Sequence, residues 1–73
     1  MDILNLKWIS EYKGNARITI MDASGKMVKM KDVKKELTDY NNRIIVSTLK
    51  PGIYYVCLKM QTGRSLITKF LKN

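Results

Sequence analysis

Apolar and polar residues alternate with a period of two along most of the chain. Within one such stretch Leu4, Leu6 and Trp8 share a face, and within another Val28 and Met30 do. Because successive side chains of a β-strand point to opposite faces, this pattern predicts half-buried antiparallel strands. It is clearest in residues 2–8 (DILNLKW), 16–22 (ARITIMD) and 25–31 (GKMVKMK).

Glycine and proline mark the turns between the strands. In DASGK and QTGRS, Gly25 and Gly63 stand where a short hairpin loop needs a residue in the left-handed conformation. Pro51 fixes one backbone dihedral and Gly52 frees the next, so the chain is expected to turn sharply there.

The middle of the chain is ambiguous. Residues 31–42, KDVKKELTDYNN, contain enough helix formers for a turn or two, but so short a helix is marginal in water. We therefore expect the preceding strand to continue and a polar loop to follow at 39–42. Residues 43–49, RIIVSTL, are then expected to form a strand with Ile44 and Val46 on one face.

Residues 53–60, IYYVCLKM, are apolar on both faces, and two interpretations stay open. In the first, this is a central strand with one face in the core and the other partly covered by its neighbours. In the second, that other face is an exposed apolar strip on which another protein docks. The core set would be Tyr54, Val56, Leu58 and Met60, and the second set Ile53, Tyr55, Cys57 and Lys59.

With the final stretch LITKFLK, six strands separated by turns are expected. A chain of 73 residues is one domain. The fold class predicted is all-β, a small immunoglobulin-like antiparallel β-sandwich of about six to seven strands.

Composition removes most catalytic chemistry. The chain has no histidine and only Cys57 as a thiol, so it can form neither an internal disulfide nor a Ser-His or Cys-His pair. It also lacks the ligands of a transition-metal site. The six carboxylates are scattered, which argues against paired-acid catalysis. We predict no enzyme activity, no cofactor and no metal, with Cys57 a buried small residue.

The net charge of +8 favours acidic partners such as nucleic acid, anionic lipid or lipopolysaccharide. However, the lysines alternate with apolar residues, as solvent-facing positions of strands would. We therefore expect no nucleic-acid partner. Because no apolar run approaches the roughly 18 residues of a membrane span, we also expect no membrane insertion. The start of the chain, MDILNLKW, also lacks the basic segment and cleavage site of a secretory signal peptide.

Several motifs together resemble the C-terminal sorting domain of the type IX secretion system of Bacteroidota. That family shows an Asp-containing turn ending in Gly-Lys, an Ile-x-Val-Ser-x-Leu stretch, a Gly-x-Tyr strand and a final Lys-Phe-Leu-Lys strand. The Tyr-Pro-Asn-Pro stretch that often precedes the first strand is missing here. The matching segments are Asp22 to Val28, Ile44 to Leu49, Gly52 to Tyr54, and Lys69 to Lys72.

The resemblance implies a sorting signal that directs a passenger protein across the outer membrane and is then usually cleaved by a surface sortase. Implied partners are the outer-membrane translocon, its shuttle protein, the sortase and an upstream passenger. The protein would pass through the periplasm and then be secreted or held at the cell surface. Residues 1–73 would be one sorting domain of a larger secreted protein, and unpaired sheet edges would allow a weak homodimer.

Two groups of site residues follow from the resemblance. Lys69, Phe70, Leu71 and Lys72 are candidates for recognition by the translocon, because a terminal edge strand can extend a partner's sheet. The structural-motif group is expected to set the fold, with Tyr54 anchoring a corner by its ring and hydroxyl. It comprises Asp22, Gly25, Lys26, Pro51, Gly52 and Tyr54.

Two alternative functions remain. An immunoglobulin-like ligand- or glycan-binding module would place its function in the expected loops at 11–15 and 39–42. A nucleic-acid-binding barrel would need aromatic side chains free to stack on bases. Because most aromatic residues lie in expected strands, only Tyr12 and Tyr40 would be left for that role.

Overall fold

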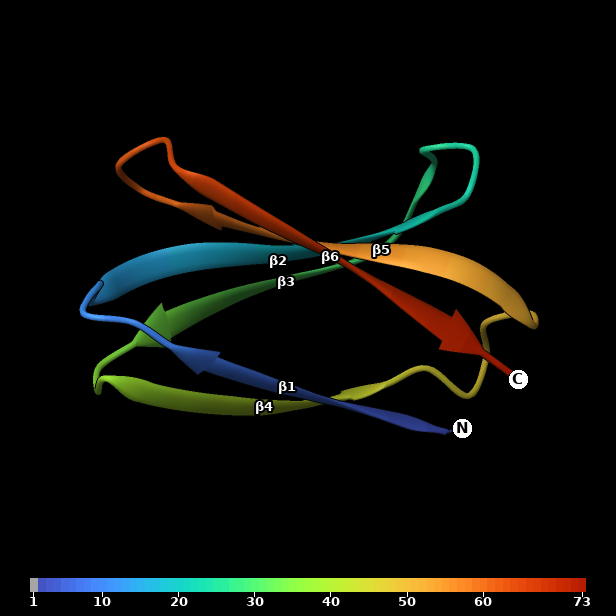
Figure 1. Cartoon of the computed structure of the whole chain (residues 1–73), viewed down its shortest axis with the longest axis horizontal. Helices are drawn as coiled ribbons and strands as arrows, with labels where there is room; N and C mark the ends of the chain where they lie inside the picture. The colour runs from blue at the N-terminus through green and yellow to red at the C-terminus, as the bar shows by residue number, and fades with distance from the viewer. Residues whose placement is uncertain (1) are drawn as a thin grey trace.

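The computed structural model describes residues 2–73, which form six β-strands and contain no helix (Figure 1). The strands are β1 (Ile3–Ile9), β2 (Gly14–Asp22), β3 (Met27–Lys35), β4 (Asp39–Ile45), β5 (Gly52–Met60) and β6 (Ser65–Lys72). Each strand overlaps one of the alternating stretches of the sequence. The predicted all-β class is confirmed.

The strands form two antiparallel sheets. One has four strands in the order β3-β2-β5-β6, and the other has two, β1 and β4. The hairpins β2–β3 and β5–β6 are joined in the middle of the larger sheet by the pairing of β2 with β5. The smaller sheet lies along one side of the larger one in Figure 1. The small antiparallel β-sandwich predicted from the sequence is therefore observed.

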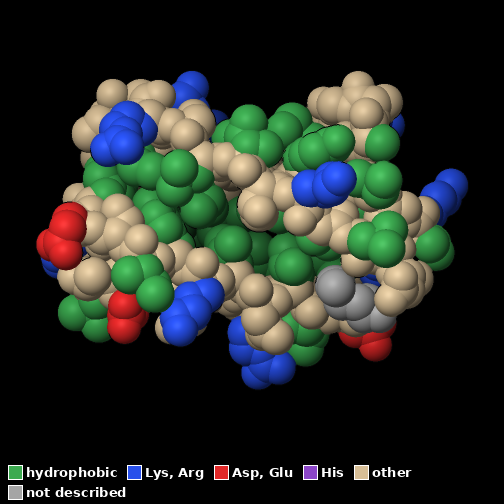
Figure 2. Space-filling model, viewed as in Figure 1, with side chains coloured by type: hydrophobic (Ala, Val, Ile, Leu, Met, Phe, Trp, Pro, Cys, Tyr) green, Lys and Arg blue, Asp and Glu red, His purple; other side chains and the backbone are tan. Residues whose placement is uncertain are grey.

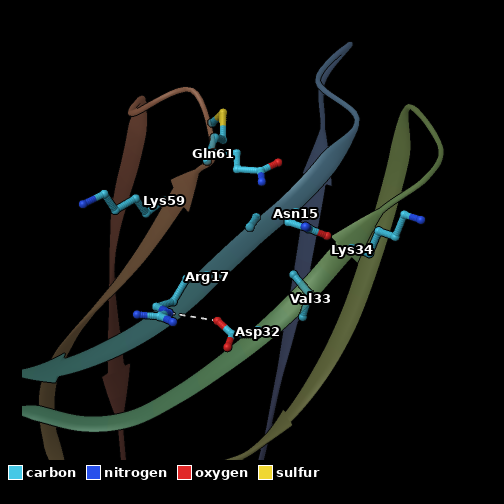
Figure 3. Close-up of a pocket in the computed structure, with 9 residues that line it drawn as sticks. Asn15, Arg17, Asp32, Val33, Lys34, Lys59 and Gln61 are labelled. Carbon is cyan, nitrogen blue, oxygen red and sulfur yellow. Dashed lines mark hydrogen bonds and ion pairs between the residues drawn. The ribbon is translucent and has the colours of Figure 1, made fainter.

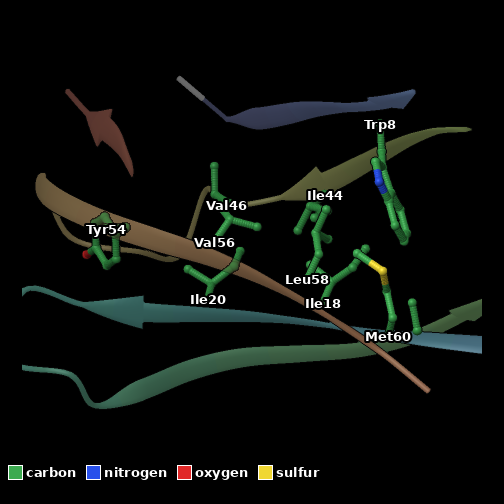
Figure 4. Close-up of a cluster of buried hydrophobic side chains, with 10 residues drawn as sticks. Trp8, Ile18, Ile20, Ile44, Val46, Tyr54, Val56, Leu58 and Met60 are labelled. Carbon is green, nitrogen blue, oxygen red and sulfur yellow. The ribbon is translucent and has the colours of Figure 1, made fainter. Parts of the chain in front are cut away.

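The core lies between the two sheets and is built from alternate residues of four strands and the segment after β4 (Figure 4). β5 contributes the four residues that alternation assigned to the core, and all four are buried: Tyr54, Val56, Leu58 and Met60. Burying one such aliphatic side chain contributes roughly 1.5–3 kcal/mol. The core residues are Trp8, Ala16, Ile18, Ile20, Ile44, Val46, Tyr54, Val56, Leu58 and Met60.

The two-stranded sheet is narrower than the four-stranded sheet, so the outer strands β3 and β6 extend past it. Inward-facing residues of the central strands are buried, whereas Lys31 on β3 and Leu66 and Thr68 on β6 are exposed. We name these inward faces the β3 flank (Lys29, Lys31, Val33, Lys35) and the β6 flank (Leu66, Thr68, Phe70, Lys72).

The far end of the β3 flank is held by a buried lysine that the sequence reading did not anticipate. Lys35 is fully buried, and its Nζ donates hydrogen bonds to the carbonyl oxygens of Ser10, Leu37 and Thr38 at 2.6, 2.5 and 2.8 Å. Nζ also lies 5.5 Å from the ring centroid of Trp8. Lys35 therefore ties the larger sheet to the ends of β1 and β4.

The interior face of β3 differs from the one that regular alternation suggested. A β-bulge between Ile20 and Met21 shifts the register, so that buried Ile20 is opposite Lys29 and not Val28. Since a one-residue shift exchanges the two faces of a strand, lysines point inward. Val28 and Met30 are 37% and 47% exposed, so the half-buried face expected for them is wrong.

The loop expected at 39–42 is also wrong, because those residues are the first half of β4. Asp39 pairs with Ile9 and Asn42 with Leu6, so β1 obtains its backbone partner from this polar segment. Long-range pairing here overrides the loop propensity of the residues. β4 ends at Ile45, earlier than predicted, and residues 14 and 15 belong to β2 and not to the preceding loop.

Candidate recognition surface

The last strand divides the four residues proposed for translocon recognition between its two faces. Phe70 is half-buried and Lys72 is buried, and both belong to the β6 flank. Lys69 is exposed and Leu71 is 59% exposed, and both point away from the core. The structure thus makes only Lys69 and Leu71 available to a partner that approaches from outside.

Phe70 and Lys72 contact the corner of the fold. The ring of Phe70 stacks on Tyr54 with centroids 5.5 Å apart and an interplanar angle of 20°. The hydroxyl of Tyr54 donates to the carbonyl oxygen of Lys50 at 2.5 Å, and Nζ of Lys72 donates to that of Leu49 at 2.7 Å. These contacts fasten the end of β6 to the connection between β4 and β5.

Pro51 and Gly52 form the turn into β5. Pro51 is exposed, and Gly52 has a φ of 154°, in the region that favours glycine. Gly52 pairs with Lys72, so the turn begins the pairing of β5 with the last strand. The Pro51-Gly52 motif therefore lies at the turn between β4 and β5, directly beside the end of β6.

The first hairpin turn is organised by the carboxylate of Asp22. Its Oδ1 accepts hydrogen bonds from the hydroxyl of Ser24 at 2.6 Å and from the backbone amides of Ser24 and Lys26 at 3.0 Å each. The hydroxyl of Ser24, followed by the amide of Lys26, holds the pKa of Asp22 below its ordinary value. Gly25 completes the turn with a φ of 89°.

The outward side of the four-stranded sheet carries a group of apolar residues, which we name the outer face. Among the described residues no strand lies over it. Cross-strand pairs join its members: Met21 is opposite Tyr55, Cys57 is opposite Ile67, and Ile53 is opposite Leu71. The outer face comprises Met21, Met27, Met30, Ile53, Tyr55, Cys57, Ile67 and Leu71.

Exposure decides between the two interpretations of β5. Tyr55 and Cys57 are half-buried by their neighbours, but Ile53 is 44% and Ile67 is 64% exposed. The second face of β5 is thus partly covered within the sheet and still belongs to an open apolar surface. The expectation that Cys57 is a buried small residue is wrong, because its side chain is only half-buried and lies on this outer face.

A depression of the surface lies at the opposite end of the sheet from Lys69 and Leu71 (Figure 3). It has a volume of about 720 Å³ and a lining of both polar and apolar side chains, with Arg17 and Asp32 facing each other across β2 and β3. Nε of Arg17 lies 2.8 Å from Oδ1 of Asp32, and this bond lowers the pKa of the Asp32 carboxyl. Both side chains are more than half exposed, so the pair is weak.

Tyr12 and Tyr40 do not form a free stacking platform. Both pack on Trp8, Tyr12 in a stacked arrangement at 5.9 Å and Tyr40 edge-on at 6.1 Å. The Tyr12 hydroxyl also accepts a hydrogen bond from the amide of Gln61. These two rings, which the sequence left as candidates for stacking on bases, are therefore engaged in contacts with Trp8.

Residues 2–73 contain no cluster of three or more His, Cys, Asp or Glu side chains that could hold a metal ion. Within the same residues no helix is long and apolar enough to cross a membrane.

Two of the features that shape this surface were missed from the sequence, namely the inward direction of Lys35 and that of Lys72. A signal for Lys72 is present in hindsight, since it is two residues after Phe70 and must share its face. Lys35 is two residues after Val33 and shares its face of β3. However, the bulge in the hairpin makes it impossible to tell from alternation alone which face of β3 points inward.

Comparison with protein families identifies the chain. The family model of the secretion system C-terminal sorting domain matches residues 1–73. The chain belongs to this family, the C-terminal sorting domains of type IX secretion, and the resemblance seen in its motifs is confirmed. Searches of curated proteins and of solved structures gave no match.

Proposed function

We propose that this domain carries a passenger protein across the outer membrane through the type IX secretion machinery and is recognised through the outward side of β6. Membership of the sorting-domain family over residues 1–73 is the observation that carries the proposal. An outer-membrane translocon, a shuttle protein and a surface sortase are the partners. The domain passes through the periplasm and reaches the cell surface with its passenger.

Recognition falls on Lys69 and Leu71, the two candidates that point outward. They continue the outer face, in which Leu71 is paired with Ile53 and Lys69 with Tyr55. An exposed apolar area of this kind is the usual mark of a protein interaction surface. The lysine adds a charge at its border, which favours a partner with an acidic margin.

Phe70 and Lys72 contribute through the fold and not through contact with the translocon. Removing either one loosens the attachment of β6 to Tyr54 and Leu49. Deletion of the last residues would therefore destroy the fold and the recognition surface together. Single outward substitutions separate these two effects.

The test fuses residues 1–73 behind a fluorescent passenger with an ordinary signal peptide in a Bacteroidota cell and compares surface with periplasmic fluorescence. The informative variant is Leu71→Asp, which places a carboxylate on the outer face. The matched control is Leu37→Asp, because Leu37 is 70% exposed in the β3–β4 turn, away from the outer face. Thermal melts of the purified variants check that both remain folded.

We expect the unmodified fusion and Leu37→Asp to reach the surface and Leu71→Asp to stay in the periplasm. Export of folded Leu71→Asp at the unmodified level would refute the assignment of recognition to the outward side of β6. Periplasmic retention of the unmodified fusion would refute the export role itself.

A further inference from the structure

One long side of the sandwich is an open apolar groove between β1 and β6. Its volume is about 310 Å³, and Figure 2 shows apolar side chains at the bottom of a hollow on this side of the molecule. The walls are Leu6 and Trp8 from β1 and Leu66 and Thr68 from β6, with Val56 and Leu58 of β5 at the base. These six residues do not belong to the outer face, whereas Ile67, which also lines the groove, does.

The groove is open because the two-stranded sheet stops at β1. Leu66 is paired with Leu58 and Thr68 with Val56, so both face the interior of the sandwich. Leu58 and Val56 are buried, yet Leu66 is 45% exposed. The space in which a strand beside β1 would cover Leu66 and Thr68 is unfilled by any of the described strands.

Both borders of the groove are strand edges with unpaired backbone groups. β1 pairs only with β4, and β6 pairs only with β5, so each keeps one free edge. A free edge next to an apolar trough suits an extended chain, whose backbone satisfies the edge while every second side chain enters the trough. A helix or a flat surface would leave the backbone groups of the edge unpaired.

Charge indicates the chemistry of the occupant. Lys7 is the charged side chain in the lining of the groove, and neither β1 nor β6 contains Asp or Glu. Lys7 alternates with Leu6 and Trp8 and therefore points outward, where it would be beside the outward residues of a strand added to β1. Acidic residues at those positions of the incoming strand match it.

We propose that the groove binds an extended, acidic segment of a partner protein as a third strand on the free edge of β1. Its inward apolar residues cover Leu66 and Thr68, and its outward acidic residues lie beside Lys7. A second copy of this chain fits less well, because each copy carries a net charge of +8. In addition, the only charged residues in the strands whose edges would meet are lysines.

The binding is tested on the purified chain, independently of export. The probe is a fluorescein-labelled heptapeptide, acetyl-Thr-Val-Glu-Val-Glu-Val-Thr-amide, which matches the length of β1 and has Val and Glu on opposite faces. One control peptide carries Lys in place of both Glu, and another carries Pro in place of the central Val. Fluorescence polarisation measures affinity, and amide hydrogen exchange followed by NMR locates the contact.

Two matched variants examine the groove. Thr68→Trp fills the trough from an exposed position and keeps a good strand former on β6. Thr48→Trp makes the same change at an exposed position between β4 and β5, outside the groove. Thermal melts establish that both variants are folded before binding is measured.

We expect saturable binding of the acidic peptide that persists in Thr48→Trp, falls at least roughly tenfold in Thr68→Trp, and slows exchange at alternate amides of β1. Both control peptides should bind at least about tenfold more weakly. Three results overturn the proposal: no binding of the acidic peptide, equal binding of all three peptides, or binding that is unchanged by Thr68→Trp. Concentration-dependent dimerisation that Thr68→Trp abolishes would assign the groove to a second copy and also overturn it.

Discussion

The hairpins β2–β3 and β5–β6 share a framework and differ in the surface that they present. The two five-residue turns, Asp22–Lys26 and Met60–Arg64, have the same backbone hydrogen bonds. In each, the amide of the first residue donates to the carbonyl oxygen of the fifth, and the carbonyl oxygen of the first residue accepts from the amide of the glycine. Each hairpin carries a strand past the edge of the smaller sheet. At the open part of the β3 flank the inward positions are the half-buried Lys29 and the exposed Lys31, whereas the β6 flank leaves Leu66 and Thr68 uncovered.

This difference shows how the same backbone arrangement can be closed or left open to a partner. A lysine extends its alkyl chain along the apolar base and keeps its charge in water, so the β3 flank needs no covering strand. Nζ of Lys31 also donates to Oδ1 of Asn42 on β4, which bridges the two sheets on that side. The β6 flank has no equivalent bridge between Leu66 and β1 among the described hydrogen bonds, and its trough remains accessible.

Both flanks end in a buried lysine, and the two lysines differ in how much they hold together. The largest expected effect is that of Lys35→Met, which removes the three hydrogen bonds that the buried Nζ donates to the carbonyl oxygens of Ser10, Leu37 and Thr38. Since a hydrogen bond to a charged group contributes about 1.5–3 kcal/mol and burial of the charge offsets part of it, we expect a loss of about 3 kcal/mol in the free energy of unfolding. Urea denaturation measures it.

The control for Lys35→Met is Lys34→Met, the exposed neighbour, whose substitution should change the free energy of unfolding by less than about 0.5 kcal/mol. Equal effects of the two substitutions would show that the contacts of Lys35 do not stabilise the fold.

A smaller loss is expected at the end of the β6 flank. Lys72→Met removes one hydrogen bond, to the carbonyl of Leu49, and keeps the alkyl chain in place. We expect a decrease of about 1 kcal/mol in the free energy of unfolding by the same urea measurement, with the exposed Lys69→Met as the control. If Lys72→Met destabilised the domain as much as Lys35→Met, the two buried lysines would stabilise the fold equally, and the difference inferred between the ends of the two flanks would be wrong.

The parts of the fold that depend on neighbouring residues could be predicted from the sequence. Alternation assigned the buried face of β5 correctly, and Gly25 and Gly63 correctly marked the two hairpin turns. Their φ values of 89° and 94° need glycine, which is why the local signal is strong. The sandwich class follows from these strands and turns.

The parts that depend on long-range pairing could not be predicted. No local signal distinguishes Asp39 to Asn42 as a strand, because these polar residues pair only after β1 has been brought beside them. The bulge at Ile20 and Met21 likewise reverses the faces of β3 without a marker in the sequence. For the candidate site, alternation separated Lys69 and Leu71 from Phe70 and Lys72, but only the packing on Tyr54 shows which pair points inward.

Making the two flanks alike sharpens the comparison with little effect on stability. Leu66→Lys gives the β6 flank the character of the β3 flank. Because Leu66 is 45% exposed, we expect the free energy of unfolding to change by no more than about 0.5 kcal/mol, as judged by urea denaturation. Fluorescence of a dye that binds apolar surface should fall relative to the unmodified chain. A loss of several kcal/mol would instead mean that Leu66 belongs to the core.

The smallest expected effect distinguishes the two turns by their response to pH. The turn of the β2–β3 hairpin has the carboxylate of Asp22 as an acceptor, whereas the matching residue of the other turn is Met60. The pKa of Asp22 is lowered in the folded chain, so its contribution to stability is complete above the ordinary value of 3.8 and is lost as the pH falls through the lower, folded-state pKa. Asp22→Asn should therefore lower the Tm slightly at pH 7 and should not lower it at a pH below the folded-state pKa.

The control is Asp39→Asn, which removes an exposed carboxylate outside both turns. A Tm difference for Asp22→Asn that stayed constant across this pH range would mean that the carboxylate's charge does not stabilise the turn, and the two hairpins would then differ only in their flanks.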